Sequence, residues 1–373
     1  MVEKNIQLII ALFLIVGAIA FLGTPQPSGN PLSEGSALCV GSNSCPGDPV
    51  KTGKSNFRQA PELIGLSGFI NTDKSISLAA LRGKVVIVDF WTYSCINCIR
   101  TIPYLNSWHE KYAGKGLVII GVHSPEFEFE KNYQNVKSAV EKFNIKYPVV
   151  QDNDFATWRS YNNRYWPHKF LIDPQGYIRY DHIGEGGYEE TETKIVELLN
   201  ERDSSLEIEN AKTTLDQNTD FSKIRTPELY LGYEFARAPL GNEEGFSPGR
   251  IVSYSLPDSF VPNLVYLEGK WENSADYMRL SSPKGKVVLL FSAKNVNIVA
   301  GSPTGSKVIP LLERLPLGAN EKGTDVYFVD GNFSVDVKGQ RLYNVVSLPD
   351  YSLKRLELDV EGEGFELYTF TFG

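Results

Sequence analysis

Two cysteines stand three residues apart, at Cys95 and Cys98, in the stretch VVIVDFWTYSCINCIR. A pair at this spacing supports three kinds of chemistry: a redox dithiol, half of a metal site, or two ordinary buried thiols. The stretch begins with an apolar, mostly β-branched run over 85–90, which predicts a central parallel strand buried on both faces. Apolar residues then recur at three- and four-residue spacing and predict a helix over 98–113. The two sulfurs are therefore expected at a strand-to-helix turn.

This position favours the redox chemistry. A helix N-terminus presents unsatisfied N–H groups and a partial positive charge, which stabilise a thiolate over a thiol. Thiols at such sites have pKa values between roughly 3.5 and 7.5, instead of ~8.5. The first sulfur is expected to be exposed and the second to lie one turn behind it. Cys95 would then attack the disulfide of a partner, and Cys98 would resolve the mixed disulfide.

The surrounding sequence predicts the elements that hold this turn in place. A short first strand is expected in SISLAALRGK, and GLVIIGVHS predicts the next buried strand. An amphipathic helix over 129–143, a short strand in KYPVVQD, a hairpin with its turn at 173–176 and a closing helix in YEETETKIVELLNE follow. This order predicts a three-layer α/β domain over 57–202.

Four separated features of this domain resemble the thioredoxin superfamily. They are the Asp-Phe-Trp strand end at Asp89, the Cys-x-x-Cys pair, Pro103 in the following helix, and Trp166-Pro167 before HKFLID. Residues 126–154 resemble the insertion of the extracytoplasmic TlpA-like branch. FWTYSCINC together with GVHSPEFEFE is similar to the thioredoxin-like domain of DipZ-type proteins.

The resemblance implies roles for particular residues. Asp89 would relay a proton to the resolving thiol, and Pro167, in a cis bond, would dock the substrate backbone beside the catalytic cysteines. The substrate groove would be lined by Trp91, Tyr93, Ile96, Asn97, Trp166 and His168. No cofactor and no metal are implied. Ile96-Asn97 replaces the Gly-Pro that is common between such cysteines, and Ser94 replaces a tryptophan. These positions tune the reduction potential, and Ile-Asn does not indicate its value. That the protein reduces its substrates is therefore implied by the TlpA-like resemblance alone.

Three alternatives stay open beside this interpretation. Thr92 stands three residues before Cys95, as in the Thr-x-x-Cys of peroxiredoxins, although Val88 occupies the place of the usual proline. A metal site is the second alternative, because His168 follows the cis-proline position, although the Cys-x-x-Cys spacing is shorter than that of copper-handling relatives. The third is a non-enzymatic protein that binds a surface ligand on a thioredoxin-like scaffold.

The N-terminal region indicates the compartment. Residues 6–22 carry no charge, Lys4 precedes them, and no basic residue follows until Lys51. We expect 1–23 to be a membrane anchor or a cleaved signal peptide, with the rest of the chain outside the cytoplasm, or secreted if the signal is cleaved. Residues 24–56, rich in Pro, Gly and Ser, predict a flexible linker in which Cys39 and Cys45 form a small structural disulfide.

The C-terminal part has a different pattern. After a polar linker over 203–224, helical periodicity gives way to short alternating runs, which predict an all-β sandwich over 225–373. TPELYLGYEFA and YLEGKWENSADYMRL resemble the jelly-roll domain at the C-terminus of DipZ-type proteins. Its ligand would be a glycan or a protein; Tyr266, Trp271 and Tyr277 are the aromatic candidates for stacking on sugar rings.

Charge and resemblance together limit the partners. The formal net charge is −8 and the pI is about 5.3, whereas a nucleic-acid-binding protein needs a basic face. Nucleic acid is therefore excluded as a partner. The resemblance implies disulfide-bearing exported proteins as substrates and a membrane electron donor of the DipZ type.

Overall fold

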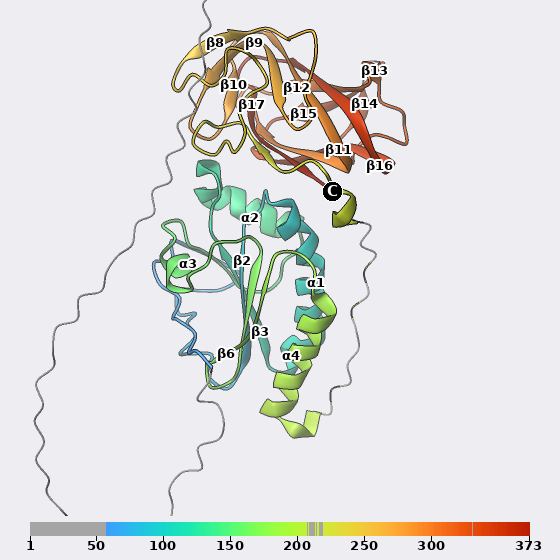
Figure 1. Ribbon diagram of the computed structural model, residues 1–373. Helices are drawn as coiled ribbons and strands as arrows, with labels where there is room; N and C mark the ends of the chain where they lie inside the picture. The colour runs from blue at the N-terminus through green and yellow to red at the C-terminus, as the bar shows by residue number, and fades with distance from the viewer. Residues whose placement is uncertain (1–56, 207, 209–212, 214, 216–218, 330) are drawn as a thin grey trace, which may run out of the picture. The chain divides into compact units, whose positions relative to one another are not determined.

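The computed structural model describes residues 57–206, 208, 213, 215, 219–329 and 331–373 (Figure 1). The expected anchor or signal over 1–23, the linker over 24–56 and the pair Cys39 and Cys45 lie outside these ranges. Within them, no helix combines the length and the apolar character that a membrane span requires.

A six-stranded mixed sheet forms the middle of the N-terminal domain. Its strands are β1 (Gly68–Ile70), β2 (Val85–Trp91), β3 (Leu117–His123), β4 (Val149–Gln151), β5 (His168–Ile172) and β6 (Ile178–Ile183). They lie in the order β1-β4-β3-β2-β5-β6. Strands β2, β3 and β4 are parallel, while β1, β5 and β6 run antiparallel to their neighbours. Every residue of β2 is buried, which confirms the predicted central strand.

Helices cover both faces of this sheet. They are α1 (Ile96–Tyr112), α2 (Tyr133–Lys142), α3 (Ala156–Ser160) and α4 (Tyr188–Arg202). Short 3₁₀ helices lie in the connecting segments: η1 (Ala113–Lys115), η2 (Glu128–Lys131), η3 (Ser204–Leu206) and η4 (Phe221–Lys223). Val85 and Ile87 of β2 share a core with α1, α2 and α4. Val86 and Val88 face the other way, toward α3 and the segment before β2. Figure 1 shows α3 and α4 on opposite sides of the sheet. The three-layer thioredoxin-like fold is confirmed.

Two predicted elements differ from the structure. No strand forms in SISLAALRGK; the segment makes turns, because the Glu62 carboxylate accepts the backbone N–H groups of Leu78 and Ala79 at 2.7 and 3.0 Å. The helix expected over 129–143 is split into η2 and α2. The break falls at Asn132, whose backbone is extended and whose side chain caps α2 by accepting from the Gln134 N–H.

The C-terminal domain is all-β and antiparallel. Its strands are β7 (Leu229–Tyr230), β8 (Ile251–Tyr254), β9 (Val265–Asn273), β10 (Met278–Leu280), β11 (Lys284–Gly301), β12 (Ser306–Leu312), β13 (Leu315–Pro316), β14 (Tyr327–Val329), β15 (Asn332–Val337), β16 (Arg341–Glu361) and β17 (Glu366–Phe372). The long strands β11 and β16 pair along most of their length, with register shifts after Ala293 and after Val296. The β-rich character is confirmed, whereas the jelly-roll winding and the domain bounds stay predictions.

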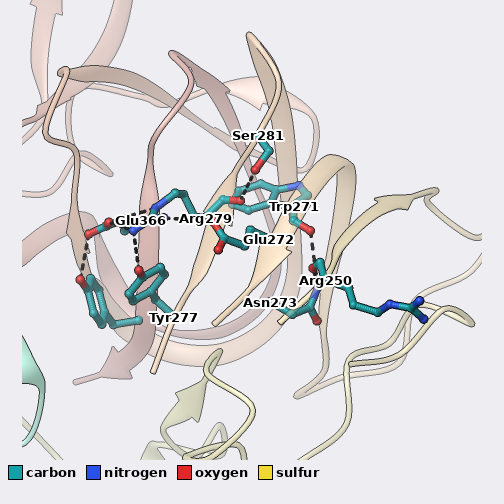
Figure 2. Close-up of polar contacts among 9 residues, drawn as sticks. Arg250, Trp271, Glu272, Asn273, Tyr277, Arg279, Ser281 and Glu366 are labelled. Carbon is teal, nitrogen blue, oxygen red and sulfur yellow. Dashed lines mark hydrogen bonds and ion pairs between the residues drawn. The ribbon is translucent and has the colours of Figure 1, made fainter. Parts of the chain in front are cut away.

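Arg279 organises a polar cluster on β9, β10 and β17 (Figure 2). Its guanidinium donates to Glu366 at 2.9 Å, to Glu272 at 3.0 Å and to the Tyr277 hydroxyl. Two of the three aromatic candidates for sugar stacking, Tyr266 and Trp271, are instead buried. That expectation is corrected for these two rings, because packing within the domain covers their faces.

Candidate active site

The chain places Cys95 at the start of α1 and Cys98 one turn into it. Cys95 is the N-cap residue, and its sulfur accepts the backbone N–H of Cys98 at 3.4 Å. Helix α1 therefore begins two residues earlier than expected. Both cysteines are free thiols; Cys95 is half-buried, whereas Cys98 is 1 % exposed. Burial first, and the neighbouring Cys95 second, raise the pKa of the Cys98 thiol. The half-buried sulfur is thus the one that a substrate can reach.

A buried acid and a buried lysine lie near the Cys98 thiol. Asp89 of β2 stands opposite Lys169 of β5 in the sheet register, and both side chains are buried. Burial raises the pKa of Asp89 to about 7, against the opposing effect of the Lys169 charge. Burial also lowers the pKa of Lys169, whose ammonium donates to the Gly184 carbonyl at 3.2 Å. A carboxyl group that titrates near neutral pH beside a thiol can accept or release a proton.

Glu130 fixes the loop before the first cysteine. One of its carboxylate oxygens accepts the Ser94 hydroxyl at 2.6 Å and the Ser94 N–H at 3.3 Å. The other accepts the backbone N–H groups of Glu126 and Phe127 at 2.5 and 3.0 Å. Burial raises the pKa of Glu130, although these hydrogen bonds act in the opposite direction. The residue adjoining Cys95 is therefore bound to η2 through one buried carboxylate.

The residues next to Glu130 also contact the C-terminal domain. Phe127 is 2 % exposed, and its ring centroid lies 5.2 Å from that of Tyr368 and 5.7 Å from that of Phe235. The Tyr230 hydroxyl donates to the Glu126 carboxyl group at 2.6 Å. Burial, followed by the charge of Glu130, raises the pKa of Glu126 to about 8. An apolar cluster and a partly buried hydrogen bond thus join the two domains beside the loop that carries Cys95.

The loop before β5 has the expected backbone. The bond between Trp166 and Pro167 is cis, which confirms that part of the prediction. The Trp166 indole donates to the Ser124 carbonyl at 3.0 Å, and the ring remains half-exposed. Gly184 donates its N–H to the Pro167 carbonyl at 2.7 Å.

The residues expected to line a substrate groove separate into two groups. Ile96, Asn97 and Trp166 are half-exposed, and Tyr93, though buried, lies at the edge of a cavity beside Ile96. Trp91 and His168 do not line a groove, which corrects the expectation. Trp91 is 1 % exposed in the core under α1.

His168 lies on the other face of the sheet because neighbouring strand residues alternate. Lys169 is the residue on the dithiol side. The two His168 ring nitrogens face Asn163 Oδ1 at 2.8 Å and Asp181 Oδ2 at 3.0 Å. In the described ranges no three His, Cys, Asp or Glu side chains come together as a metal-ligand set.

Sequence reasoning missed Lys169 and Glu130. The signal for Lys169 was a lysine within HKFLI, where a fully buried strand would otherwise be apolar. The signal for Glu130 was the alternation of acids and aromatics in PEFEFE, which placed charged residues among buried rings. Neither pattern predicts which residue the charged side chain contacts, because Ser94, the partner of Glu130, and Asp89, the neighbour of Lys169, are distant in sequence.

Comparison with known proteins agrees with this geometry. The AhpC/TSA family model matches residues 58–181, and the model of the thioredoxin-like C-terminal domain matches residues 226–373. Protein DipZ of Mycobacterium bovis is 39 % identical over 254 residues, which cover 67 % of this chain and 36 % of DipZ. The thiol-disulfide oxidoreductase ResA of Bacillus cereus is 35 % identical over 127 residues, which cover 33 % of this chain and 70 % of ResA.

A third relative, NHL repeat-containing protein 2 of Bos taurus, is 44 % identical over 120 residues, which cover 32 % of this chain and 16 % of that protein. The chain spans about a third of the length of DipZ. Fold, dithiol and matched domains define a thioredoxin-fold protein with an additional C-terminal β domain. The chain belongs to the TlpA- and DipZ-like family of these proteins.

Proposed function

We propose that this protein is a thiol–disulfide oxidoreductase whose reactive groups are Cys95 and Cys98. The observation that carries the proposal is the position of Cys95 as N-cap of α1, half-exposed, with the buried Cys98 one turn behind it. Its relatives ResA and YkuV are named thiol-disulfide oxidoreductases, which supports the same chemistry here.

The reaction would proceed in two exchanges. The Cys95 thiolate attacks one sulfur of a substrate disulfide, and the other substrate sulfur leaves as a thiolate. Cys98 then attacks the Cys95 sulfur, so that the second substrate sulfur leaves and a Cys95–Cys98 disulfide remains. The enzyme dithiol gives up two electrons and two protons, and the substrate disulfide takes them up as two thiols.

Asp89 would accept one of the two protons, the proton of the Cys98 thiol. The Cys98 thiol must lose its proton before it can attack, and burial disfavours its thiolate. The Asp89 carboxyl group lies near that thiol and has a pKa of about 7, so it can accept the proton at neutral pH. Pro167 and the half-exposed Trp166 would hold the substrate backbone.

The proposal also includes the direction of electron transfer, the cellular compartment and the partner proteins. The protein would reduce disulfides of exported proteins outside the cytoplasm, bound to the membrane by its N-terminal segment. A membrane-bound protein dithiol of the DipZ type would restore the Cys95–Cys98 dithiol. The resemblance of the dithiol region to DipZ-type proteins supports these assignments.

The test is the reduction potential of the Cys95–Cys98 pair. The full chain carrying Cys39→Ser and Cys45→Ser is equilibrated in glutathione or dithiothreitol buffers, and the remaining thiols are counted by alkylation and mass spectrometry. A potential near −270 mV, as in thioredoxin, is expected for a reductant. A potential near −120 mV would make the protein an oxidant, and failure to form the disulfide would contradict the dithiol chemistry itself.

A second candidate function is a thiol peroxidase, which the match to the AhpC/TSA family model favours. Cys95 would attack a peroxide to form a sulfenic acid, and Cys98 would displace water from it to give the same disulfide. Thr92, the residue of the peroxiredoxin-like spacing, is completely buried, and its hydroxyl lies 3.4 Å from His123 Nε2. Consumption of hydrogen peroxide by the reduced protein, at a rate comparable to its disulfide exchange, would establish this alternative.

A further inference from the structure

Two cavities open beside Ile96, the residue that follows Cys95. The first, of about 650 Å³, is lined by α1, α2 and the C-terminal domain around Arg341. The second, of about 550 Å³, is lined by Asn97, the segment 221–228 and Phe372. We propose that the two cavities form one polypeptide-binding groove, and that the first receives an acidic side chain of the substrate next to its disulfide. The proposal rests on the proposed function and names its substrate class.

The first cavity carries an excess of positive charge. Its lining includes Arg100, Lys142 and Arg341, but a single acid, Asp325. Arg341 is paired with Asp325 at 2.8 Å, and Arg100 with Glu185 at 3.5 Å. Lys142 is exposed, and its ammonium makes no ion pair within 4 Å among the described residues, although the charge of Asp325 acts on it. Asp325 is thus the one acid facing both Lys142 and Arg341, and a carboxylate on the ligand would add a second negative charge.

The position of Lys142 supports an anionic ligand. Burial first, and the charge of Arg341 second, lower the pKa of its ammonium, while the charge of Asp325 acts in the opposite direction. Lys142 and Arg341 both line the cavity. A carboxylate between them would relieve this repulsion and accept hydrogen bonds from both. The site therefore favours an aspartate or glutamate over a neutral or basic side chain.

The remaining lining fits a peptide chain. The side-chain amides of Asn295 and Gln340 border the cavity, and each can both donate to and accept from a peptide backbone. Ile99, Ala139 and Leu342 supply apolar surface between them. Pockets that bind small ligands typically combine such apolar lining with a few polar groups.

The second cavity argues for a polypeptide instead of a small disulfide. It also borders Ile96, but its other lining residues differ from those of the first cavity. They include Phe221, which is 52 % exposed. A ligand confined to one cavity would leave the other empty. An extended chain, at ~3.3 Å per residue, can occupy both and cross Ile96, the residue that follows Cys95.

The C-terminal domain is then part of the substrate site. It contributes Asn295, Gln340 and Arg341 to the first cavity and Phe372 to the second. The Tyr93 hydroxyl, two residues before Cys95, donates to the Gln340 carbonyl at 3.2 Å. The domain that selects the substrate and the loop that reacts with it are thus in direct contact.

The test compares disulfide peptides that differ at one position. The full chain carrying Cys39→Ser and Cys45→Ser, in detergent, is assayed with peptides that have Asp, Ser or Lys beside the disulfide, and with glutathione disulfide. At low salt the kcat/KM for the Asp peptide should exceed that for the Ser peptide about fivefold, the range of a single partly screened ion pair. Lys142→Glu should abolish or invert this ratio. Lys146→Glu, at an exposed lysine outside both cavities, should preserve it.

Several results would overturn the proposal. Equal kcat/KM values for the three peptides, or an Asp preference that survives Lys142→Glu, would remove the acidic site. If Lys142→Glu changed the kcat/KM for glutathione disulfide only, the cavity would be a site for a small disulfide, and the polypeptide groove would be rejected. Absence of any disulfide exchange would reject the proposed function instead. The groove is then tested separately with Asp and Lys peptides in which serine replaces cysteine. Their affinities are measured by fluorescence anisotropy, and equal affinities would reject the groove.

Discussion

The Ser94 hydroxyl lies 2.6 Å from the Glu130 carboxylate, and Ser94 is the residue immediately before Cys95. The same carboxylate accepts two backbone N–H groups of its own segment. Because Glu130 is fully buried, water does not compete for these hydrogen bonds. The position of the nucleophile therefore depends on a side chain that lies outside both the Cys-x-x-Cys motif and its helix.

Glu130→Gln should destabilise the protein and shift the potential of the dithiol. An amide has one acceptor oxygen, so its NH₂ group would face either Ser94 or the two backbone donors. We expect a loss of about 1–3 kcal/mol in the free energy of unfolding, measured in urea. We also expect the Cys95–Cys98 potential to change by about 30 mV, which corresponds to ~1.4 kcal/mol. Glu128→Gln, at an exposed carboxylate paired with Lys131, is the control. An unchanged potential in Glu130→Gln would limit Glu130 to a structural role.

Cys98→Ser should trap a substrate on the protein. Without a resolving thiol, the mixed disulfide between Cys95 and the substrate has no internal route to break down. A covalent adduct on Cys95 should accumulate, as seen on a non-reducing gel and located by mass spectrometry. Cys95→Ser is the matched variant and should give no adduct. Adducts that form equally well on Cys98 in that variant would show that the roles of the two thiols were assigned wrongly.

Asp89 should make the stability of the reduced protein depend on pH. The folded state raises the pKa of this carboxyl group from 3.8 to about 7, so the folded protein binds the proton more tightly than the unfolded chain. The stabilising contribution is complete below about pH 4 and is lost as the pH rises through 7, with an upper limit of about 4 kcal/mol.

Asp89→Asn should remove this dependence. Urea denaturation of the reduced protein at pH 4.5, 6 and 7.5 would show a smaller decline in the free energy of unfolding for the variant than for the wild type. Asp336→Asn, at an exposed position in β15, should keep the wild-type decline. An identical decline in Asp89→Asn would mean that another group causes it.

The hydrogen bond between Tyr230 and Glu126 should couple the two domains. Tyr230→Phe leaves the partly buried Glu126 carboxyl group without this donor and should cost about 1–3 kcal/mol. Glu126→Gln removes the other partner, and the double variant completes a thermodynamic cycle. We expect a coupling free energy of at least about 0.5 kcal/mol, measured by denaturation of the full chain. Strictly additive effects would show that this contact contributes nothing to the docking of the domains.

The sequence was sufficient for the features that depend on local patterns. The buried strand before Cys95 and the helix after it follow from periodicity and motif spacing, whereas the cis bond before Pro167 was implied by the resemblance to the thioredoxin superfamily. The position of His168 was predicted wrongly, because a shift of one residue in a strand moves a side chain to the opposite face. The faces of β5 are fixed by its pairing with β2, which puts Lys169 beside Asp89. Partners brought together by the tertiary fold, such as Ser94 and Glu130, have no signature in either segment alone.

The order of the strands in the sheet has a consequence for the growing chain. Strand β2, which carries Asp89 and leads to the dithiol, lies between β3 and β5, and β5 is made long after the cysteines. Until it docks, the neighbour that supplies Lys169 is missing, and long-range strand pairing is slow compared with helix formation. The Cys98 thiol and Asp89 therefore pass through a nascent stage without the Lys169 charge that lies near them in the native domain. A chain that stopped before β5 would carry the complete Cys-x-x-Cys motif and Asp89 without that lysine.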